Sequence, residues 1–213
     1  MTYLAAHFEE HQAEAIHGLL RKHPLATWVV PTADRPQIHH VPMLLDTTRG
    51  PHGTLIGHVA RANPVWQELG FESVAVFQGP QAYVSPNWYP SKQVHGQHVP
   101  TWNYAVVHAH GVTRAVQDRS AVLAIVQRLT DHFEASQAHP WQVSDAPADY
   151  LERMLGAIVG IEIEVQRWDA KFKLSQNHDA ANRAGIAQGL VDGAPSDDQT
   201  ALAALVLRDA PPP

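Results

Sequence analysis

Residues 102–116, WNYAVVHAHGVTRAV, form the longest strand-like stretch of this 213-residue sequence, and they decide its fold class. The stretch is rich in the β-branched and aromatic residues that favour extended chain. Similar patterns occur at 25–30, 38–46, 54–59, 73–79, 81–85 and 158–168. These segments follow one another too closely for helical crossovers, so we predict a mostly antiparallel sheet.

Helices are predicted at the ends of this sheet and in one long insertion. Residues 7–22 and 118–137 carry apolar residues at helical spacing, and Asp118 is placed to be an N-cap. Shorter helices are expected at 64–69, 147–155 and 178–189. The predicted fold class is therefore α+β, with a barrel-like antiparallel sheet and peripheral helices.

Two strands carry features that predict their position in the sheet. Pro42 interrupts the pattern of 38–46, which indicates an edge strand or a bulge. In 158–168, apolar residues alternate with Glu162, Glu164 and Gln166. That alternation predicts a strand with one face in water.

The composition excludes several classes of function. The chain has no cysteine, which rules out disulfides, zinc–thiolate sites, iron–sulfur clusters and a cysteine nucleophile. Lys and Arg number 15 against 21 Asp and Glu, so the net charge of −6 disfavours direct binding to nucleic acid. We find no signal-peptide pattern and no apolar run near the roughly 20 residues of a membrane span, and expect a cytoplasmic protein.

Common catalytic and metal-binding motifs are also missing. The sequence contains no G-x-S-x-G, no P-loop, no G-x-G-x-x-G and no HExxH. There are 15 histidines, and His108 and His110 would share one face of a strand, as two metal ligands could. We expect no bound metal and interpret the histidines as polar surface residues and partners of buried carbonyls.

A possible anion site lies in GHVARANP (57–64), where a strand leads into a helix start. The Arg61 guanidinium beside the free N–H groups of a helix would suit a phosphate. The alternative is an arginine that only caps a turn.

The proline-rich segment GPQAYVSPNWYPSK (79–92) is a possible site for a planar ligand. Aromatic side chains held by rigid turns lose little entropy when they stack on a flat ring. Alternatively, Trp88 and Tyr89 pin this loop over the mouth of the barrel. Both interpretations can hold together.

Two further segments are VPTWNY (99–104) and KFKLSQN (171–177). The second offers alternating cations followed by amides, which suit a phosphate or a carbonyl-rich heterocycle. It could instead be a solvated strand edge that lysines protect from aggregation.

Taken together, these segments resemble one family. GHVARANPVW, GPQAYVSPNWYPSK, VPTWNYAVVH, SDAPADY with AIVGIEIEV, and KLSQN are similar, in order, to the PaiB-type FMN-binding negative transcriptional regulators. The resemblance covers about residues 1–190 and leaves 191–213 as a C-terminal tail, part of which we expect to be disordered. It implies a split β-barrel of the pyridoxamine-phosphate-oxidase kind and a homodimer with FMN bound in clefts between subunits.

The resemblance also implies which residues bind the cofactor. Those expected are His58, Ala60, Arg61, Asn63, Ser85, Trp88, Tyr89, Ser91, Lys92, Thr101, Trp102, Asn103, Lys173, Ser175 and Gln176. Two positions depart from the family's pattern. Gln97 stands where the family has a lysine, and Phe172 stands where it has a tryptophan.

We expect an FMN-binding regulator that lowers transcription indirectly, because the sequence shows no helix-turn-helix pattern and carries net negative charge. One alternative is a flavin-dependent oxidoreductase acting on a small molecule. Another is a split-barrel dimer that binds haem or a different planar ligand.

Overall fold

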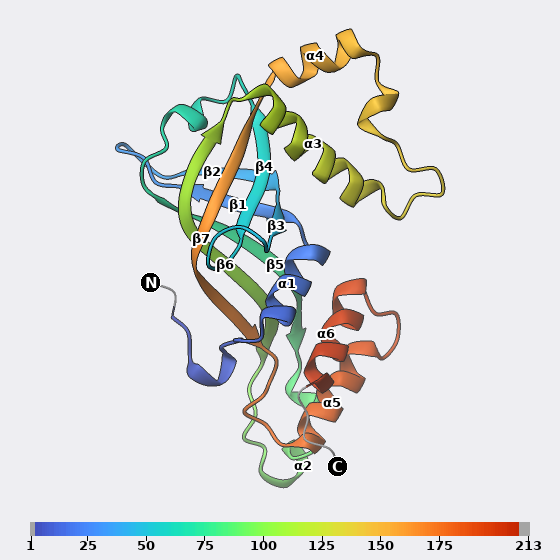
Figure 1. The fold of residues 1–213 in the computed structure, drawn as a ribbon. Coiled ribbons are helices and arrows are strands. Elements are labelled where there is room, and N and C mark those ends of the chain that lie inside the picture. Colours follow the sequence, from blue (N-terminus) through green and yellow to red (C-terminus); the bar gives the residue numbers. More distant parts are fainter. Residues whose placement is uncertain (1–2, 209–213) are drawn as a thin grey trace. The chain divides into compact units, whose positions relative to one another are not determined.

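The computed structural model describes residues 3–208. It forms two compact units. Unit 1 comprises Met1–Leu19, Gln78–Val107 and Asp169–Pro213, and unit 2 comprises Leu20–Phe77 and His108–Trp168. The strands β5, β6 and β7, the long ones in Figure 1, each contain residues of both units.

Seven strands form one sheet in the order β2-β1-β5-β6-β7-β4-β3. Their bounds are β1 Leu25–Val30, β2 Gln37–Pro42, β3 Leu44–Asp46, β4 Thr54–Ala60, β5 Glu72–Val84, β6 Thr101–Val116 and β7 Ile158–Lys173. Strand β1 pairs antiparallel with β2 and β5, and β4 pairs antiparallel with β3 and β7. The predicted antiparallel pairing is confirmed for these strands.

The helices and 3-10 turns are short except α3. They are η1 Ala6–Phe8, α1 Ala13–Lys22, η2 Pro64–Gln67, η3 Pro86–Trp88, α2 Lys92–His95, α3 Arg119–Glu134, η4 Val143–Asp145, α4 Ala148–Gly156, α5 Ala180–Val191 and α6 Asp197–Arg208. Asp118 caps α3 as predicted, because its carboxylate accepts a hydrogen bond from the Ala121 N–H at 2.9 Å. None of the described helices is long and apolar enough to cross a membrane.

Prolines account for two differences from the predicted strands. Residues 73–79 and 81–85 are one strand, β5, that continues through Pro80. Strand β1 pairs with β5 only at Val74–Val76. Pro80 lies further along β5, so the N–H group that proline lacks is not needed for pairing with β1. Conversely, 38–46 divides after Pro42 into β2 and β3.

The first predicted helix is shorter than expected. The periodicity predicts a helix from residue 7, but α1 begins at Ala13. Glu9 forms an isolated antiparallel bridge with Lys171, and the Glu10 N–H donates to the Ala170 carbonyl. These contacts hold Glu9 and Glu10 extended, so the 3-10 turn η1 and helix α1 remain separate.

The prediction of a wet face on β7 is wrong at Glu162, which is buried in unit 2. Its carboxylate accepts hydrogen bonds from Arg49 at 2.7 and 2.8 Å and from Arg114 Nε at 2.7 Å. The two arginines satisfy the carboxylate, and so a charged residue lies where alternation predicted water. Glu164 and Gln166 are exposed, as predicted.

The core of unit 2 contains a hydrogen-bonded chain across three neighbouring strands. Trp28 of β1 is fully buried, and its indole N–H donates to the Ser73 hydroxyl of β5 at 3.0 Å. That hydroxyl lies 2.7 Å from the Thr113 hydroxyl of β6. On another part of the sheet, α3 packs Ile125 and Leu129 against Ile56 of β4.

Unit 1 contains the helical pair α5 and α6. Helix α6 lies within the predicted tail, and it has a buried apolar face that includes Leu202 and Val206. The buried Arg183 of α5 donates to the Val206 carbonyl, joining the two helices. The final residues, 209–213, for which disorder was also expected, lie outside the described range.

Candidate functional site

The most concentrated group of predicted site residues lies in unit 1, where β6 begins and β7 ends. The Lys173 ammonium donates to the Thr101 hydroxyl at 2.7 Å and to the Trp102 carbonyl at 2.5 Å. One residue further along β6, the Asn103 amide donates to the Ser175 hydroxyl at 2.9 Å. The structure therefore joins two segments about 70 residues apart through polar contacts, as a shared site requires.

The Lys173 side chain is half-buried, and this affects its pKa. Burial lowers the pKa of this ammonium, and the neighbouring Lys171 lowers it further. An anion bound beside Lys173 would offset that cost. Two of its three donors are engaged by Thr101 and Trp102, and an ammonium can give the third to a phosphate oxygen.

Ser175 has an unusual backbone conformation for a non-glycine residue. Its φ is 63°, in the left-handed region, and its side chain is buried against Asn103. Such strained residues concentrate at functional sites. The neighbouring Gln176 uses its amide within the same turn, accepting from Leu174 N–H at 2.7 Å and donating to the Phe172 carbonyl at 2.5 Å. Gln176 therefore shapes the turn.

The aromatic residues of the loop after β5 are packed within unit 1. A Cβ added at Gly189 of α5 would come within 2.3 Å of the Trp88 ring, which shows how closely the ring lies on that helix. Tyr89 is 3% exposed, stacks on His98 with ring centroids 4.3 Å apart, and meets His178 edge-on at 5.0 Å. Burial raises the pKa of Tyr89. These contacts support the interpretation in which both residues pin the loop.

The polar residues of the same loop bind one another. Ser91 Oγ lies 2.7 Å from His98 Nε2 and donates to the Asn182 side-chain oxygen at 2.9 Å. Lys92 donates to the Asn87 side-chain oxygen at 2.5 Å, and Ser85 accepts from the Asn87 N–H. Sequence reasoning did not assign His98, His178 and Asn182 to the site, because they lie outside the motifs and their partners depend on how the chain folds back.

Trp102 is the aromatic residue of this group that remains open to a ligand. It is 54% exposed and contacts Tyr83 edge-on, with ring centroids 6.3 Å apart. Lys173 contacts the backbone carbonyl of Trp102, and the indole itself offers a flat apolar surface to solvent.

The remaining predicted residues, His58, Ala60, Arg61 and Asn63, lie in unit 2 and form a separate local arrangement. Arg61 Nε donates to the Gly156 carbonyl at 2.9 Å, and Nη2 donates to the Ile158 carbonyl at 3.0 Å. Its third nitrogen, Nη1, contacts Gln117 at 3.3 Å. The guanidinium thus joins the end of α4 to the start of β7. These contacts support the alternative interpretation, in which Arg61 caps a turn.

The helix start beside Arg61 also differs from the prediction. Element η2 is a 3-10 turn of four residues, and Asn63 already accepts its Val65 N–H at 3.1 Å. The expected row of free N–H groups is therefore not formed there. Ala60, at the end of β4, is exposed, and the His58 side chain lines two cavities described below.

Comparison with known proteins identifies the family. Residues 2–167 match the FMN_bind_2 family, described as "Putative FMN-binding domain", and the chain belongs to this family. Protein AN0679 of Emericella nidulans is 33% identical over 226 residues, covering 88% of this chain and 89% of its own. Protease synthase and sporulation protein PAI 2 of Bacillus subtilis is 28% identical, covering 88% of both chains.

The fold has solved relatives. The FAD and Heme binding protein from Mycobacterium smegmatis superimposes with a TM-score of 0.59 at 18% identity, covering 85% of this chain and 80% of that one. The predicted class, an α+β fold with an antiparallel split-barrel sheet, is confirmed, as are the resemblance to PaiB-type proteins and FMN as the cofactor.

The residues of unit 1 fit such a cofactor chemically. A flavin mononucleotide presents a phosphate, a planar ring and a carbonyl-rich edge. Lys173 and the Thr101 hydroxyl suit the phosphate, and exposed Trp102 suits the ring. Asn103, a predicted site residue, is fully buried and hydrogen-bonded to Ser175, so it holds β6 to the turn after β7 and does not face a ligand.

Proposed function

We propose that this FMN-binding protein holds its flavin with the Lys173, Thr101 and Trp102 side chains and lowers transcription indirectly, as a cytoplasmic homodimer. The observation that carries the proposal is the contact of the Lys173 ammonium with the Thr101 hydroxyl and the Trp102 backbone carbonyl, which places a cation and a hydroxyl together on the strand that carries the exposed Trp102. The name of PAI 2 ties that relative to protease synthesis and sporulation, which supports a regulatory role.

Each of these residues has a chemical role in the proposal. Lys173 and Thr101 bind the phosphate, and Trp102 covers one face of the ring and excludes water from it. Asn103, fully buried and paired with Ser175, holds the start of β6 against the turn after β7 and so positions Thr101 and Trp102. The bound flavin supplies electron transfer, which the protein tunes through these contacts.

The charges of unit 1 support indirect action on transcription. The helical pair α5 and α6 contains two arginines. Arg183 is buried against Val206, and Arg208 is paired with Glu10 at 2.6 Å. The first turn of α6 carries Asp197 and Asp198, which would repel DNA phosphates. We therefore expect any DNA binding to be weak and to disappear at physiological salt.

A flavin titration tests the proposed site. We expect Lys173→Gln to weaken FMN binding by about 10- to 100-fold, because it removes a charge-assisted contact worth roughly 1.5–3 kcal/mol. Lys171→Gln is the matched control on the same strand, and it should change the affinity by less than about twofold. Riboflavin, which lacks the phosphate, should bind the wild type and both variants alike. Unchanged FMN affinity in Lys173→Gln would contradict this assignment.

A flavin-dependent oxidoreductase is the second candidate function. The observation that favours it is the pair of cavities beside His58 in unit 2, which provide room for a small molecule. The absorption spectrum of the purified protein would distinguish flavin from haem. Oxidation of NADH or NADPH by the flavin-loaded protein would then favour the enzyme over the regulator.

A further inference from the structure

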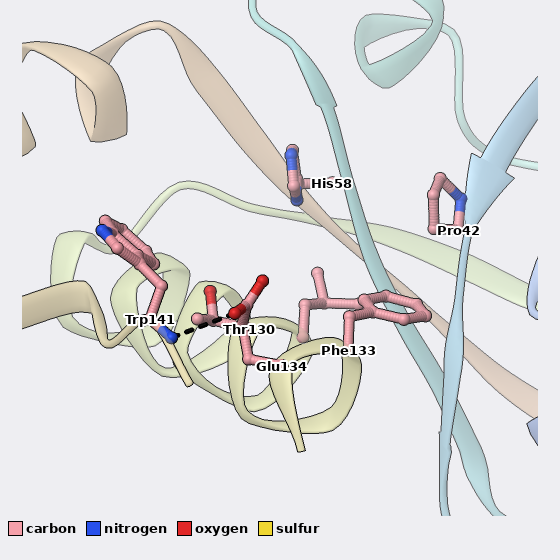
Figure 2. A pocket seen from close by; sticks show the side chains of 7 residues that line it. Pro42, His58, Thr130, Phe133, Glu134 and Trp141 are labelled. Atoms are coloured by element: carbon pink, nitrogen blue, oxygen red, sulfur yellow. Dashed lines mark hydrogen bonds between the residues drawn. The ribbon is translucent and has the colours of Figure 1, made fainter. Parts of the chain in front are cut away.

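Two adjacent cavities in unit 2 share His58 and Trp141 as lining residues. Their volumes are about 350 and 270 Å³, so the first lies at the lower end of the usual size range for small-molecule sites and the second lies just below it. Figure 2 shows the first cavity, with His58 above Thr130 and Phe133 of α3, Trp141 on the left and Pro42 on the right. The second cavity lies against α4 and is lined mainly by apolar residues, Tyr150 and Met154 among them.

The imidazole of His58 is the first sign that this space takes a ligand. Its Nδ1 is buried and has no hydrogen-bond partner among the described residues. A buried polar atom without a partner costs roughly 1–3 kcal/mol, so a native structure that keeps one needs a reason. Burial also lowers the pKa of His58, so the ring is neutral at pH 7 and carries one donor and one acceptor nitrogen.

The charge on the cavity wall is the second sign. Glu134 of α3 lines the first cavity, and one of its oxygens accepts the Trp141 backbone N–H at 3.0 Å (Figure 2). This hydrogen bond positions the carboxylate while leaving it further acceptor capacity. The residues that line the two cavities, all of them described, include no lysine or arginine. The wall is therefore negative at one point, carries no cation from Lys or Arg, and is mostly apolar elsewhere.

Aromatic side chains provide the third sign. Phe133, Trp141 and Tyr150 lie around the two cavities, and each is 41–47% exposed. Exposed aromatic rings that converge on a hollow mark binding sites more often than isolated surface residues do. The faces of Trp and Tyr rings also attract organic cations.

We propose that the cavities beside His58 form a binding site for a small aromatic amine. The ammonium group pairs with the Glu134 carboxylate, the ring lies against Trp141 and Phe133, and a polar group on the ligand meets His58. The site uses residues of unit 2 alone, and the inference does not depend on the flavin site proposed in unit 1.

Isothermal titration of the full-length protein with tryptamine tests this proposal. Indole-3-acetate is the matched anion, because it has the same ring and the opposite charge. We expect tryptamine to bind at least about tenfold more tightly than indole-3-acetate. Equal affinities, or no heat from millimolar tryptamine, would overturn the proposal.

Variants on α3 locate the interaction. Glu134→Gln keeps an oxygen for the Trp141 N–H and removes the charge, so tryptamine affinity should fall about tenfold or more. Asp131→Asn removes the same charge from an exposed position of the helix that does not line either cavity, and it should leave the affinity within about twofold. Equal effects of the two variants would show only a general attraction to an acidic surface and would refute the site.

A second measurement follows His58 directly. In an NMR spectrum that resolves the imidazole resonances, the His58 signals should shift when tryptamine is added. The signals of His139, an exposed histidine in the same unit, should not shift. An unmoved His58 signal at saturating tryptamine would place the amine elsewhere. FMN titration of Glu134→Gln should match wild type, which separates failure of this site from failure of the flavin site.

Discussion

At the scale of single residues, Arg61 shows how one side chain can suit two roles. The sequence places it beside a helix start, which suggests a phosphate contact, yet its guanidinium donates to the Gly156 and Ile158 carbonyls. Free carbonyls at the end of a helix also attract a cation, as a phosphate does. The local sequence cannot distinguish these roles, because the acceptors lie almost 100 residues away.

We therefore expect Arg61→Ala to lower the free energy of unfolding by about 1–3 kcal/mol, since two carbonyls lose their donor. Its effect on FMN affinity should be smaller than that of Lys173→Gln. Denaturant unfolding and flavin titration of the same preparations measure the two quantities. Weaker FMN binding with unchanged unfolding would reverse this view and restore the phosphate role.

Two buried carboxylates of unit 2 predict how stability depends on pH. The Arg49 hydrogen bonds, followed by those of Arg114, lower the pKa of Glu162. The Thr48 hydroxyl and Arg128 hold the pKa of Asp46 at about 2. Both values lie below those of the unfolded chain, so the stabilisation is complete above about pH 5 and is lost as the pH falls toward the folded values.

The melting temperature should accordingly decrease from about pH 5 to about pH 2. Glu162→Gln should melt lower at pH 7 and show a shallower decrease with acid, because one of the two titrating groups is gone. Glu152→Gln, which breaks an exposed ion pair with Arg119, is the control and should keep the wild-type slope. Parallel curves for wild type and Glu162→Gln would contradict the assignment.

At the scale of secondary-structure elements, the strands were largely predictable and their interruptions were not. Leu25–Val30 forms a strand with the predicted bounds, because a short β-branched run has few alternatives. Whether Pro42 or Pro80 ends a strand depends on which N–H groups the neighbouring strand requires. The burial of Glu162 likewise depends on Arg49, 113 residues away. Long-range partners of this kind leave no local pattern.

The contact between Trp88 and α5 gives a prediction at this scale. Gly189→Ala would place a methyl group 2.3 Å from the Trp88 ring. We expect it to lower the free energy of unfolding by about 1–3 kcal/mol, although alanine is intrinsically the better helix former. Gly70→Ala is the control, since a Cβ there would meet no described atom within 4 Å, and it should stay within about 0.5 kcal/mol of wild type. A Gly189→Ala variant as stable as the control would show that the loop can move aside without cost.

At the scale of the whole molecule, the predicted site residues divide between the two units. The residues of 85–103 and 173–176 lie in unit 1, and those of 58–63 lie in unit 2. The motifs could identify the family, because they occur as continuous words in a fixed order. The motifs could not reveal which of their residues contact one another, since that depends on how strands β5, β6 and β7 bring distant segments together.

We expect the protein to be a homodimer in solution. Several large apolar side chains are exposed, including Val94, Val99 and Trp102 of unit 1, and association would remove them from water. Sedimentation at micromolar concentration should give about twice the chain mass of 23.5 kDa. A species of 23.5 kDa under these conditions would contradict both the dimer and a flavin cleft shared between subunits.

The hydrogen bond from Trp28 to Ser73 makes one indole proton a natural probe of the sheet. Trp28 is fully buried, whereas Trp102 and Trp141 are about half exposed. In deuterated water the indole protons of the exposed tryptophans should exchange at once, but that of Trp28 must wait until strands β1, β5 and β6 separate. The rate at which this single resonance fades would therefore time the opening of the sheet, with no label added to the protein.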